Sequence, residues 1–440
     1  MDRRPALALA TVAMMLAGCD EAATNADPAD SPTGATTTTS APAPAPTVTP
    51  PAPTGAVDPL VVIAHFTRPQ LRLTAQRAAD LVARRGTAGV ARTVRAVEQD
   101  PDAVGVVPLS RVGPTVVVAR VDGLDPVRDY EGATTLLVTG DLMVVRGVPD
   151  PEAALAPMRQ LLRGADLTIG NLESTLSTDG SPTQGGDSFG GTPALVPVLE
   201  DAGFDALSLA NNHAGDYGER ALVQTVGTLQ QSRIRPFGAG DDLAEAAEPA
   251  VLSAPDGTTF AFLGFNAIGE TPRADGETPG ALSVRMPPRT GPLVEADLAR
   301  VERAIRSAQR RADVVVVLPH WGTQYTHVPE PVQRTVARRL VAAGADLVAG
   351  GHPHWVQGVD AVAGVPVLHS LGNFVFDMYW EPQVLEGVVL ESTWWDGDLK
   401  AIWLVPYAMD VSDYAPRPVS GERAADILAD VRSTSTGPYR

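Results

Sequence analysis

Short apolar runs alternate with amphipathic segments through the middle of the chain. The runs have the length of buried strands, which predicts strands over Thr135–Thr139, Leu167–Ile169, Ala206–Ala210, Phe260–Phe265, Val314–Leu318, Leu347–Ala349 and Val365–Leu368. Between the later runs, apolar residues recur at helical spacing, at Val294, Leu298, Val301, Ile305 and Ala308 and again at Val332, Val336 and Leu340. This alternation predicts an α/β fold whose buried sheets are covered by helices.

The pattern changes near the C-terminus. The apolar runs Val388–Trp394 and Leu399–Tyr407 flank Asp396-Gly397-Asp398, which is typical of a β-hairpin. A last helical segment, Ala424–Val431, is expected within a C-terminal tail of residues 411–440. We therefore expect the main domain over residues 131–410.

Residues 57–130 have the composition of a small N-terminal α+β domain. Strands are expected over Leu60–His65, Ala103–Val107 and Thr115–Val121, and a helix over Leu73–Arg85, which Gly86 ends. Residues 102–126 resemble a lobe fragment of periplasmic solute-binding proteins. A solute-binding role and a purely structural role both remain open for this domain.

The chain begins with features of an export signal. Arg3 and Arg4 precede an apolar stretch, Pro5–Leu16, and Leu16-Ala17-Gly18-Cys19 follows. This resembles a bacterial lipoprotein signal of residues 1–18, which implies lipidation of Cys19 and a location outside the cytoplasmic membrane. An ordinary secretory signal with an incidental cysteine is the alternative. Residues 19–56 are rich in Ala, Thr and Pro and are expected to form a disordered tether.

Charge and cysteine content exclude one class of partner and one kind of cross-link. The 440-residue chain carries a net charge of −18, which argues against nucleic acid as a partner. Cys19 is its single cysteine, so no intrachain disulfide can form. The expected attachment to the membrane is therefore through a lipid rather than through a basic surface.

Polar residues follow five of the expected strands. They are Asp141, Asn171 with Glu173, Asn211 to His213, His320, and His352 with His354. In α/β sheets, ligands bind at the carboxyl ends of strands. Carboxylates, imidazoles and an amide oxygen suit a pair of divalent ions, which activate a water and hold an anionic substrate. A histidine that does not bind metal can protonate the leaving group.

Six motifs give the chain a family resemblance. TGDLMVVR, IGNLEST, SLANNHAGDYG, LPHWGTQY, GGHPHWVQG and SLGNFVFD occur in this order between Thr134 and Asp377. They resemble the CapA-type poly-γ-glutamate capsule biosynthesis family of the calcineurin-like metallophosphatase fold. The resemblance implies a two-sheet α-β-β-α sandwich and a role in making, exporting or anchoring an anionic extracellular polymer. The implied partner is that polymer or its membrane synthase.

The resemblance also implies roles for individual residues. Asp141 and His354 would bind a first metal, Glu173 would bridge, and the second metal would be bound by Asn212, His320 and His352. His213 would donate a proton with support from Asp216. The pocket would be lined by Asn171, Asn211 and Asn373. One or two divalent ions are expected, and the sequence does not distinguish Mn, Fe, Zn or Mg.

One residue departs from the metallophosphatase pattern. Active phosphatases usually begin with Asp-x-His, whereas this chain has Asp141-Leu142-Met143, as the capsule family commonly does. A thioether is a poor ligand for hard divalent ions, so the first site loses a ligand. Three alternatives follow: a metal-dependent hydrolase or transferase, a non-catalytic scaffold that binds polymer or synthase, and a phosphoesterase unrelated to capsule.

Overall fold

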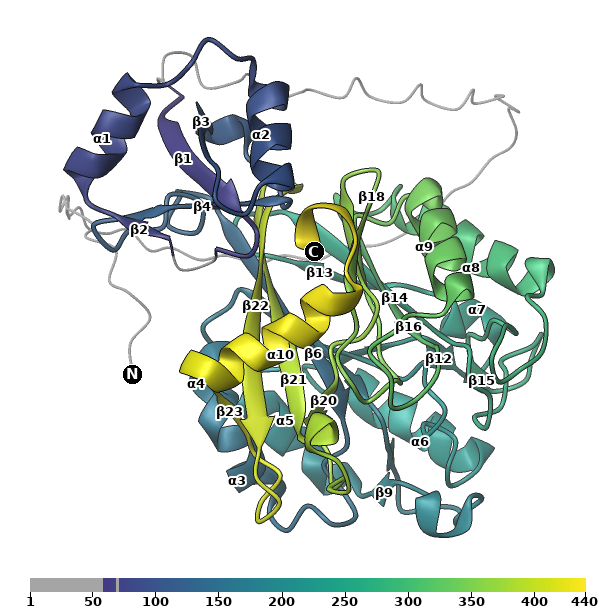
Figure 1. The fold of residues 1–440 in the computed structure, drawn as a ribbon. Helices are drawn as coiled ribbons and strands as arrows, with labels where there is room; N and C mark the ends of the chain where they lie inside the picture. Colours follow the sequence, from purple (N-terminus) through teal and green to yellow (C-terminus); the bar gives the residue numbers. More distant parts are fainter. Residues whose placement is uncertain (1–57, 69–70) are drawn as a thin grey trace, which may run out of the picture. The chain divides into compact units, whose positions relative to one another are not determined.

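Two β-sheets pack face to face in the main part of the chain (Figure 1). The structure, a computed structural model, describes residues 58–68 and 71–440. Residues from Val57 to the C-terminus belong to one compact unit. Cys19, the expected signal and the expected tether lie outside the described residues.

The first sheet has eight strands and contains both parallel and antiparallel pairs. Its order is β11-β10-β7-β6-β21-β22-β23, and β20 also pairs with β6. The strands are β6 (Thr134–Leu142), β7 (Leu167–Leu172), β10 (Ala206–Ser208), β11 (Arg235–Phe237), β20 (Asn373–Val375), β21 (Glu386–Trp395), β22 (Asp398–Met409) and β23 (Pro416–Pro418). Because β6, β7, β10 and β11 are parallel, their carboxyl ends lie at one edge.

The second sheet has six strands in the order β13-β14-β16-β17-β19-β18. They are β13 (Ala250–Ser253), β14 (Thr259–Asn266), β16 (Val314–His320), β17 (Leu347–Ala349), β18 (Val359–Val362) and β19 (Val365–Leu368). The four central strands β14, β16, β17 and β19 are parallel, and β13 and β18 run antiparallel at the edges. The parallel strands therefore also deliver their carboxyl ends to one edge.

Alternate residues of each strand enter different layers of the core. Val314 and Val316 of β16 pack between the two sheets with Leu136 of β6, whereas Val315 and Val317 face the helices on the outside. Burial on both faces explains why these strands are continuous apolar runs in the sequence. Their side chains hold two sheets and two helical layers together.

Helices cover both outer faces. Helices α8 (Glu295–Ala308) and α9 (Pro331–Ala343) lie beside the second sheet (Figure 1), and their apolar stripes join its outer core. The other main-domain helices are α3 (Pro151–Leu155), α4 (Arg159–Leu162), α5 (Val196–Ala202), α6 (Glu219–Gln230), α7 (Leu243–Ala246) and α10 (Gly421–Thr434). Residues of α3 to α6 form the outer core of the first sheet. The α-β-β-α sandwich is therefore confirmed.

The N-terminal module, residues 58–130, has a three-stranded sheet of its own. Its order is β3-β1-β4, and the elements of the module are β1 (Leu60–His65), β2 (Arg72–Leu73), α1 (Ala75–Ala83), α2 (Val90–Gln99), β3 (Val104–Pro108), β4 (Val116–Val118) and β5 (Arg120–Val121). The expected strand Thr115–Val121 is divided, because the backbone N–H of Ala119 bonds to Val62 and that of Arg120 bonds to Leu71. Helix α2 was not predicted, since its five exposed or half-buried polar positions obscure one apolar stripe of Val90, Val94 and Val97.

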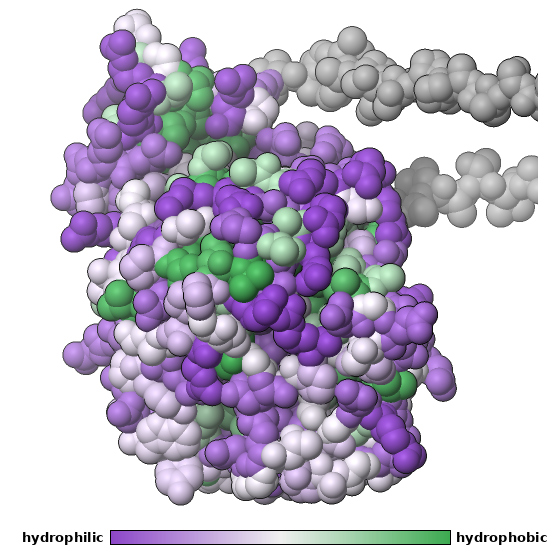
Figure 2. All heavy atoms as spheres, turned by 90° about the vertical axis from the view of Figure 1, so that its right-hand side faces the viewer, coloured by the Kyte–Doolittle hydropathy of each residue, from purple (hydrophilic) through white to green (hydrophobic). Residues whose placement is uncertain are grey.

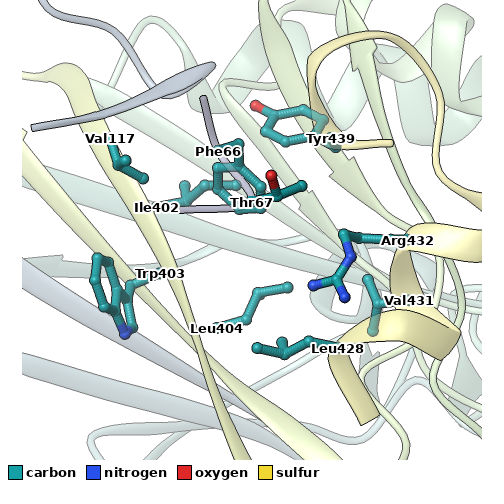
Figure 3. A pocket seen from close by; sticks show the side chains of 10 residues that line it. All are labelled: Phe66, Thr67, Val117, Ile402, Trp403, Leu404, Leu428, Val431, Arg432 and Tyr439. Carbon is teal, nitrogen blue, oxygen red and sulfur yellow. The ribbon is translucent and has the colours of Figure 1, made fainter. Parts of the chain in front are cut away.

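The module packs on the β21–β22 hairpin and on the C-terminus. The Trp395 ring joins the apolar core of the module, and its indole N–H donates to the carbonyl of Val127 over 3.0 Å. Phe66 meets Tyr439 edge to face at 4.8 Å between ring centroids. The small cavity beside them, with Trp403 and Leu428 (Figure 3), holds about 30 Å³, which is room for about one water molecule. It is a packing gap rather than a ligand site.

The face of the molecule in Figure 2 is mostly hydrophilic. Purple residues predominate on it, and green areas are small and separate. No helix among residues 58–68 and 71–440 is both long enough and apolar enough to cross a membrane.

Asp360 of β18 ties the second sheet to α9 and to the C-terminus. It forms an ion pair with Arg334, lies 2.9 Å from Nε2 of His369 and accepts a 2.7 Å hydrogen bond from Thr436. Although burial alone would raise its pKa, the hydrogen bonds and charges of His369, Thr436 and Arg334 lower the pKa of Asp360 to about 2. His369, which directly follows β19, takes part in this cluster.

We expect Asp360→Asn to lower the free energy of unfolding by about 2 kcal/mol at pH 7, because each pKa unit corresponds to about 1.4 kcal/mol. Because the pKa of Asp360 is lower in the folded than in the unfolded protein, its stabilisation of the fold is complete above the pKa of the unfolded state. This stabilisation is lost as the pH falls toward about 2. The difference between the two proteins should therefore shrink by roughly half near pH 3. Urea unfolding of both at each pH measures it. A difference that stays constant with pH would contradict the assignment.

Candidate metal centre

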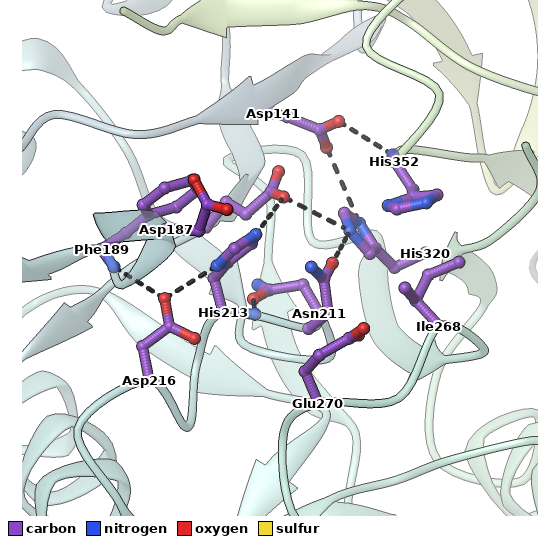
Figure 4. Close-up of polar contacts among 12 residues, drawn as sticks. Asp141, Asp187, Phe189, Asn211, His213, Asp216, Ile268, Glu270, His320 and His352 are labelled. Atoms are coloured by element: carbon purple, nitrogen blue, oxygen red, sulfur yellow. Dashed lines mark hydrogen bonds and ion pairs between the residues drawn. The ribbon is translucent and has the colours of Figure 1, made fainter. Parts of the chain in front are cut away.

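The carboxyl ends of both sheets meet at one polar site. Asp141 lies near the end of β6, opposite Asn171 of β7 in the sheet register, and Glu173 directly follows β7. From the second sheet, His320 is the last residue of β16, and His352 and His354 follow β17. Figure 4 shows Asp141, His213, His320 and His352 converging from these separate elements. The structure thus brings together the polar strand ends of the sequence.

Two fully buried carboxylates form the centre of the site. Asp141 and Glu173 are both 0% exposed. Neither oxygen of Glu173 has a hydrogen-bond partner among the described residues. Burial and the charge of Glu173 raise the pKa of Asp141 to about 7, and burial raises the pKa of Glu173. Buried carboxylates without partners are costly unless a cation compensates them.

Three buried histidines surround these carboxylates. Burial lowers the pKa of His320 to about 4 and that of His354 to about 4, and it lowers the pKa of His352 well below its usual range. All three imidazoles are therefore neutral at pH 7 and carry a lone pair that can bind a metal. The Nδ1 atom of His352 has no hydrogen-bond partner within residues 58–440 as described.

The donor atoms fall into two overlapping groups. Asp141, Glu173 and His354 each offer an atom within 4.8 Å of the others, which suits one cation. On the other side, Nε2 of His320 lies 3.6 Å from Glu173 and 2.8 Å from the amide oxygen of Asn212. Glu173 belongs to both groups. The carboxylates, neutral imidazoles and unpartnered atoms fit divalent metal ions.

His213 is held by a separate set of contacts. Its Nδ1 lies 2.7 Å from Asp216, which also accepts a hydrogen bond from the backbone of Phe189 (Figure 4). Asp216 accepts a further hydrogen bond from Gln184. Burial alone would lower the pKa of His213, but the Asp216 hydrogen bond and the Glu173 charge raise it. The Phe189 ring stacks on the imidazole at 3.8 Å between centroids. Nε2 is thus left facing Glu173 at 3.8 Å.

The three asparagines expected to line the pocket act as buried braces. Asn171 donates to Asp141 over 2.9 Å, and its own oxygen accepts from Asn211 over 3.0 Å. Asn211 also accepts from the backbone N–H of His213. Asn373 lies 2.8 Å from Nδ1 of His354, which orients that ring. Their side chains therefore position the candidate ligands.

The His-x-His segment has an unusual backbone. His352 and His354 have φ values of +93° and +60°, a region that non-glycine residues rarely adopt and that is common at functional sites. A Cβ on the preceding Gly351 would lie 2.3 Å from an oxygen of Asp141. Glycine at 351 is therefore required for Asp141 to reach the backbone N–H of His352 at 2.8 Å.

Met143 lies in an apolar cluster beside the site. It is fully buried and packs with Val145, Phe189, Phe376, Met378 and Val384. A hydrophobic environment of this kind favours a thioether and disfavours an imidazole. The candidate cation site of Asp141, Glu173 and His354 does not include Met143.

Several residues around the site were missed by sequence reasoning. Gln184 and Phe189 come from a Gly- and Ser-rich loop that carries no motif. Tyr325 stacks on His354 at 5.9 Å and has a φ of +60°. Its signal was available, because it lies within the LPHWGTQY motif.

Comparison with known proteins identifies the family. Residues 135–378 match the family described as "Bacterial capsule synthesis protein PGA_cap". The chain belongs to this family. It is 30% identical to the capsule biosynthesis protein CapA of Bacillus anthracis, over 69% of this chain and 74% of that protein. It is 32% identical to the PGA biosynthesis protein CapA of Bacillus subtilis, over 55% of this chain and 63% of that protein.

A relative from Mycobacterium tuberculosis is also named for the synthesis of a polymer. The probable polyglutamine synthesis accessory protein of Mycobacterium tuberculosis is 29% identical over 48% of this chain and 56% of its own length. The predicted CapA-type family is thus confirmed. The main domain carries the whole matched segment, and the N-terminal module lies before it.

The first prediction from the site concerns the braces. Asn373→Ala removes the hydrogen bond that orients His354, so we expect metal affinity to fall by about 10- to 100-fold. Glu173→Gln should lower it further, because Glu173 belongs to both donor groups. Metal content and competition titration with Mn²⁺ and Zn²⁺ measure both effects. His65→Ala in the N-terminal module is the control, and equal losses in all three variants would refute the site.

The second prediction concerns pH. Because the pKa of Asp141 is about 7 in the metal-free site, protons compete with metal below that pH. Apparent affinity should fall by about tenfold per pH unit below pH 7 for one displaced proton. In Asp141→Asn this dependence should flatten, although affinity is lower throughout. Isothermal titration from about pH 8 to about pH 5 measures the slope, and equal slopes would contradict the role of Asp141.

Proposed function

We propose that this protein is a cell-surface lipoprotein that acts on an anionic extracellular polymer, such as poly-γ-glutamate, through a metal-dependent hydrolase or transferase centre. Membership of the capsule synthesis family supports the polymer-related role. The observation that carries the chemistry is the unpartnered Glu173 carboxylate facing Nε2 of His213 at 3.8 Å.

The candidate ligands are Asp141, Glu173, Asn212, His320, His352 and His354. Divalent ions bound there supply an activated water and polarise the substrate oxygen. The braces Asn171, Asn211 and Asn373 hold the ligands in place. Phe189 and the walls of the two sheets limit access of bulk water to His213, which is 7% exposed.

His213 is the proposed general acid. Asp216 accepts from Nδ1 and so fixes the ring, which leaves the proton on Nε2 available to a leaving group. The Asp216 hydrogen bond and the Glu173 charge raise the pKa of His213 and so favour the form that carries this proton. As the leaving group departs, the proton moves from Nε2 to the departing oxygen or nitrogen.

A non-catalytic scaffold is the second candidate, and Met143 favours it. Its apolar surroundings supply no further ligand to the Asp141 side of the site. A scaffold that binds polymer or a membrane synthase requires no turnover. It predicts that polymer production survives Asp141→Asn and His352→Ala, whereas the enzymatic proposal predicts loss in both.

The proposed location is the outer face of the cell membrane. The support is the Leu16-Ala17-Gly18-Cys19 sequence and the Ala- and Pro-rich segment that follows it. Cys19→Ser should abolish labelling of the protein by radioactive palmitate and release it from the membrane fraction. Membrane retention of this variant would contradict lipid anchoring.

The test of the enzymatic proposal is turnover of γ-glutamyl oligomers and of a phosphodiester by metal-loaded protein. We expect His213→Ala to lower kcat by about 100- to 10,000-fold with unchanged metal content, since general acid catalysis contributes this much. His65→Ala should retain full activity. Turnover of the phosphodiester alone would favour a phosphoesterase. Activity that is equal in wild type and His213→Ala, or absent from both, would refute the catalytic role.

A further inference from the structure

Many arginines of the protein form ion pairs, and in the N-terminal module Arg120 binds Asp125 and Arg128 binds Glu391. In the main domain, Arg273 and Arg285 bind Asp297, and Arg339 binds Glu302. Within the described residues, no ion pair or side-chain hydrogen bond is found for five exposed arginines of the module: Arg84, Arg85, Arg92, Arg95 and Arg111. Residues 81–97 contain four of these and no acidic residue, in a chain with a net charge of −18.

Three of these arginines, Arg92, Arg95 and Arg111, line an open groove. It has a volume of about 880 Å³ and is lined by the loop 86–89, the first turn of α2, Arg92, Arg95 and Arg111. A Cβ at Gly86 or at Gly89 would meet no atom within 4 Å, so the loop leaves the space open. We call this feature the arginine groove. Its size exceeds what a single small anion needs.

The backbone adds to the positive potential. Helix α2 begins after Gly89 with no side-chain cap, and its first turn lines the groove. The N-terminal end of a helix carries partial positive charge. Three guanidinium groups and this helix end therefore all attract anions to the groove, whereas the acidic remainder of the chain repels polyanions.

We propose that the arginine groove binds a polymer with repeated carboxylate groups. A guanidinium pairs with a carboxylate through two parallel hydrogen bonds, and several arginines along one groove match several successive carboxylates. The lining contains no aromatic side chain on which a nucleic-acid base would stack. Its one branched apolar side chain, Val90, packs against the core of the module rather than forming a surface that would enter a membrane interface.

The groove and the metal centre use different residues. The groove lies in residues 86–111, before the segment that matches the family, and all candidate metal ligands lie within that segment. The inference shares the polymer class with the proposed function, but each can fail alone. The groove would hold the polymer near the protein through residues that take no part in the metal centre.

The experiment is a titration of the full chain with fluorescent poly-γ-glutamate of defined length, followed by anisotropy at low and at physiological salt. The test variant is R92Q/R95Q/R111Q. The matched control is R235Q/R303Q/R338Q, which removes three exposed arginine charges from the main domain. All six side chains are exposed, and thermal unfolding verifies that both variants fold.

We expect the test variant to bind at least about tenfold more weakly, because three exposed charge pairs are lost, and to depend less on salt. The control should change affinity by less than about twofold. Equal weakening in both variants would refute binding at the arginine groove, since the affinity would then depend only on the net charge of the protein. Tighter binding of polyphosphate, DNA or anionic vesicles than of poly-γ-glutamate would overturn the assignment to a polycarboxylate.

Discussion

The burial of Glu173 constrains the whole site. Its two oxygens have no hydrogen-bond partner among the described residues, although the side chain is fully buried. Such a carboxylate destabilises the metal-free fold, and the surrounding elements must offset that cost. The extensive apolar core between the two sheets does so. The sandwich can therefore keep its charged groups close together and largely out of water.

The same constraint explains the unusual local geometry. Asp141 accepts from the backbone N–H of His352, and this requires Gly351 and a left-handed backbone at His352 and His354. The asparagines complete the arrangement, because their amides link one strand end to the next. The hydrogen bonds of the buried side chains thus hold His352 and His354 in their unusual backbone conformation, and that conformation in turn places the N–H of His352 against Asp141.

The strands were predictable because burial on both faces makes them continuous apolar runs. The convergence of Asp141, Glu173, His320 and His354 followed from their positions at strand ends. The role of Asn373 as a brace was not predictable, since its contact with His354 crosses two sheets and depends on the three-dimensional register. Strand β10 ends at Ser208 rather than Ala210. The N–H of Leu209 still bonds to Phe237 of β11, but the N–H of Ala210 bonds to the side chain of Ser208 instead of to a neighbouring strand. Apolar composition alone does not reveal this change of hydrogen-bond partner.

The position of β21 has a consequence for how the family segment must be handled. Strand β6, which carries Asp141, has β21 as its antiparallel neighbour, and β21 begins at Glu386, eight residues after the matched segment ends at 378. A fragment cut at that boundary would leave one side of β6 without a hydrogen-bonded partner over Thr134 to Val138. Its core residues would face water, and its open edge would invite association with other chains. The hairpin is thus part of the folding unit of the metal centre, although the family segment does not include it.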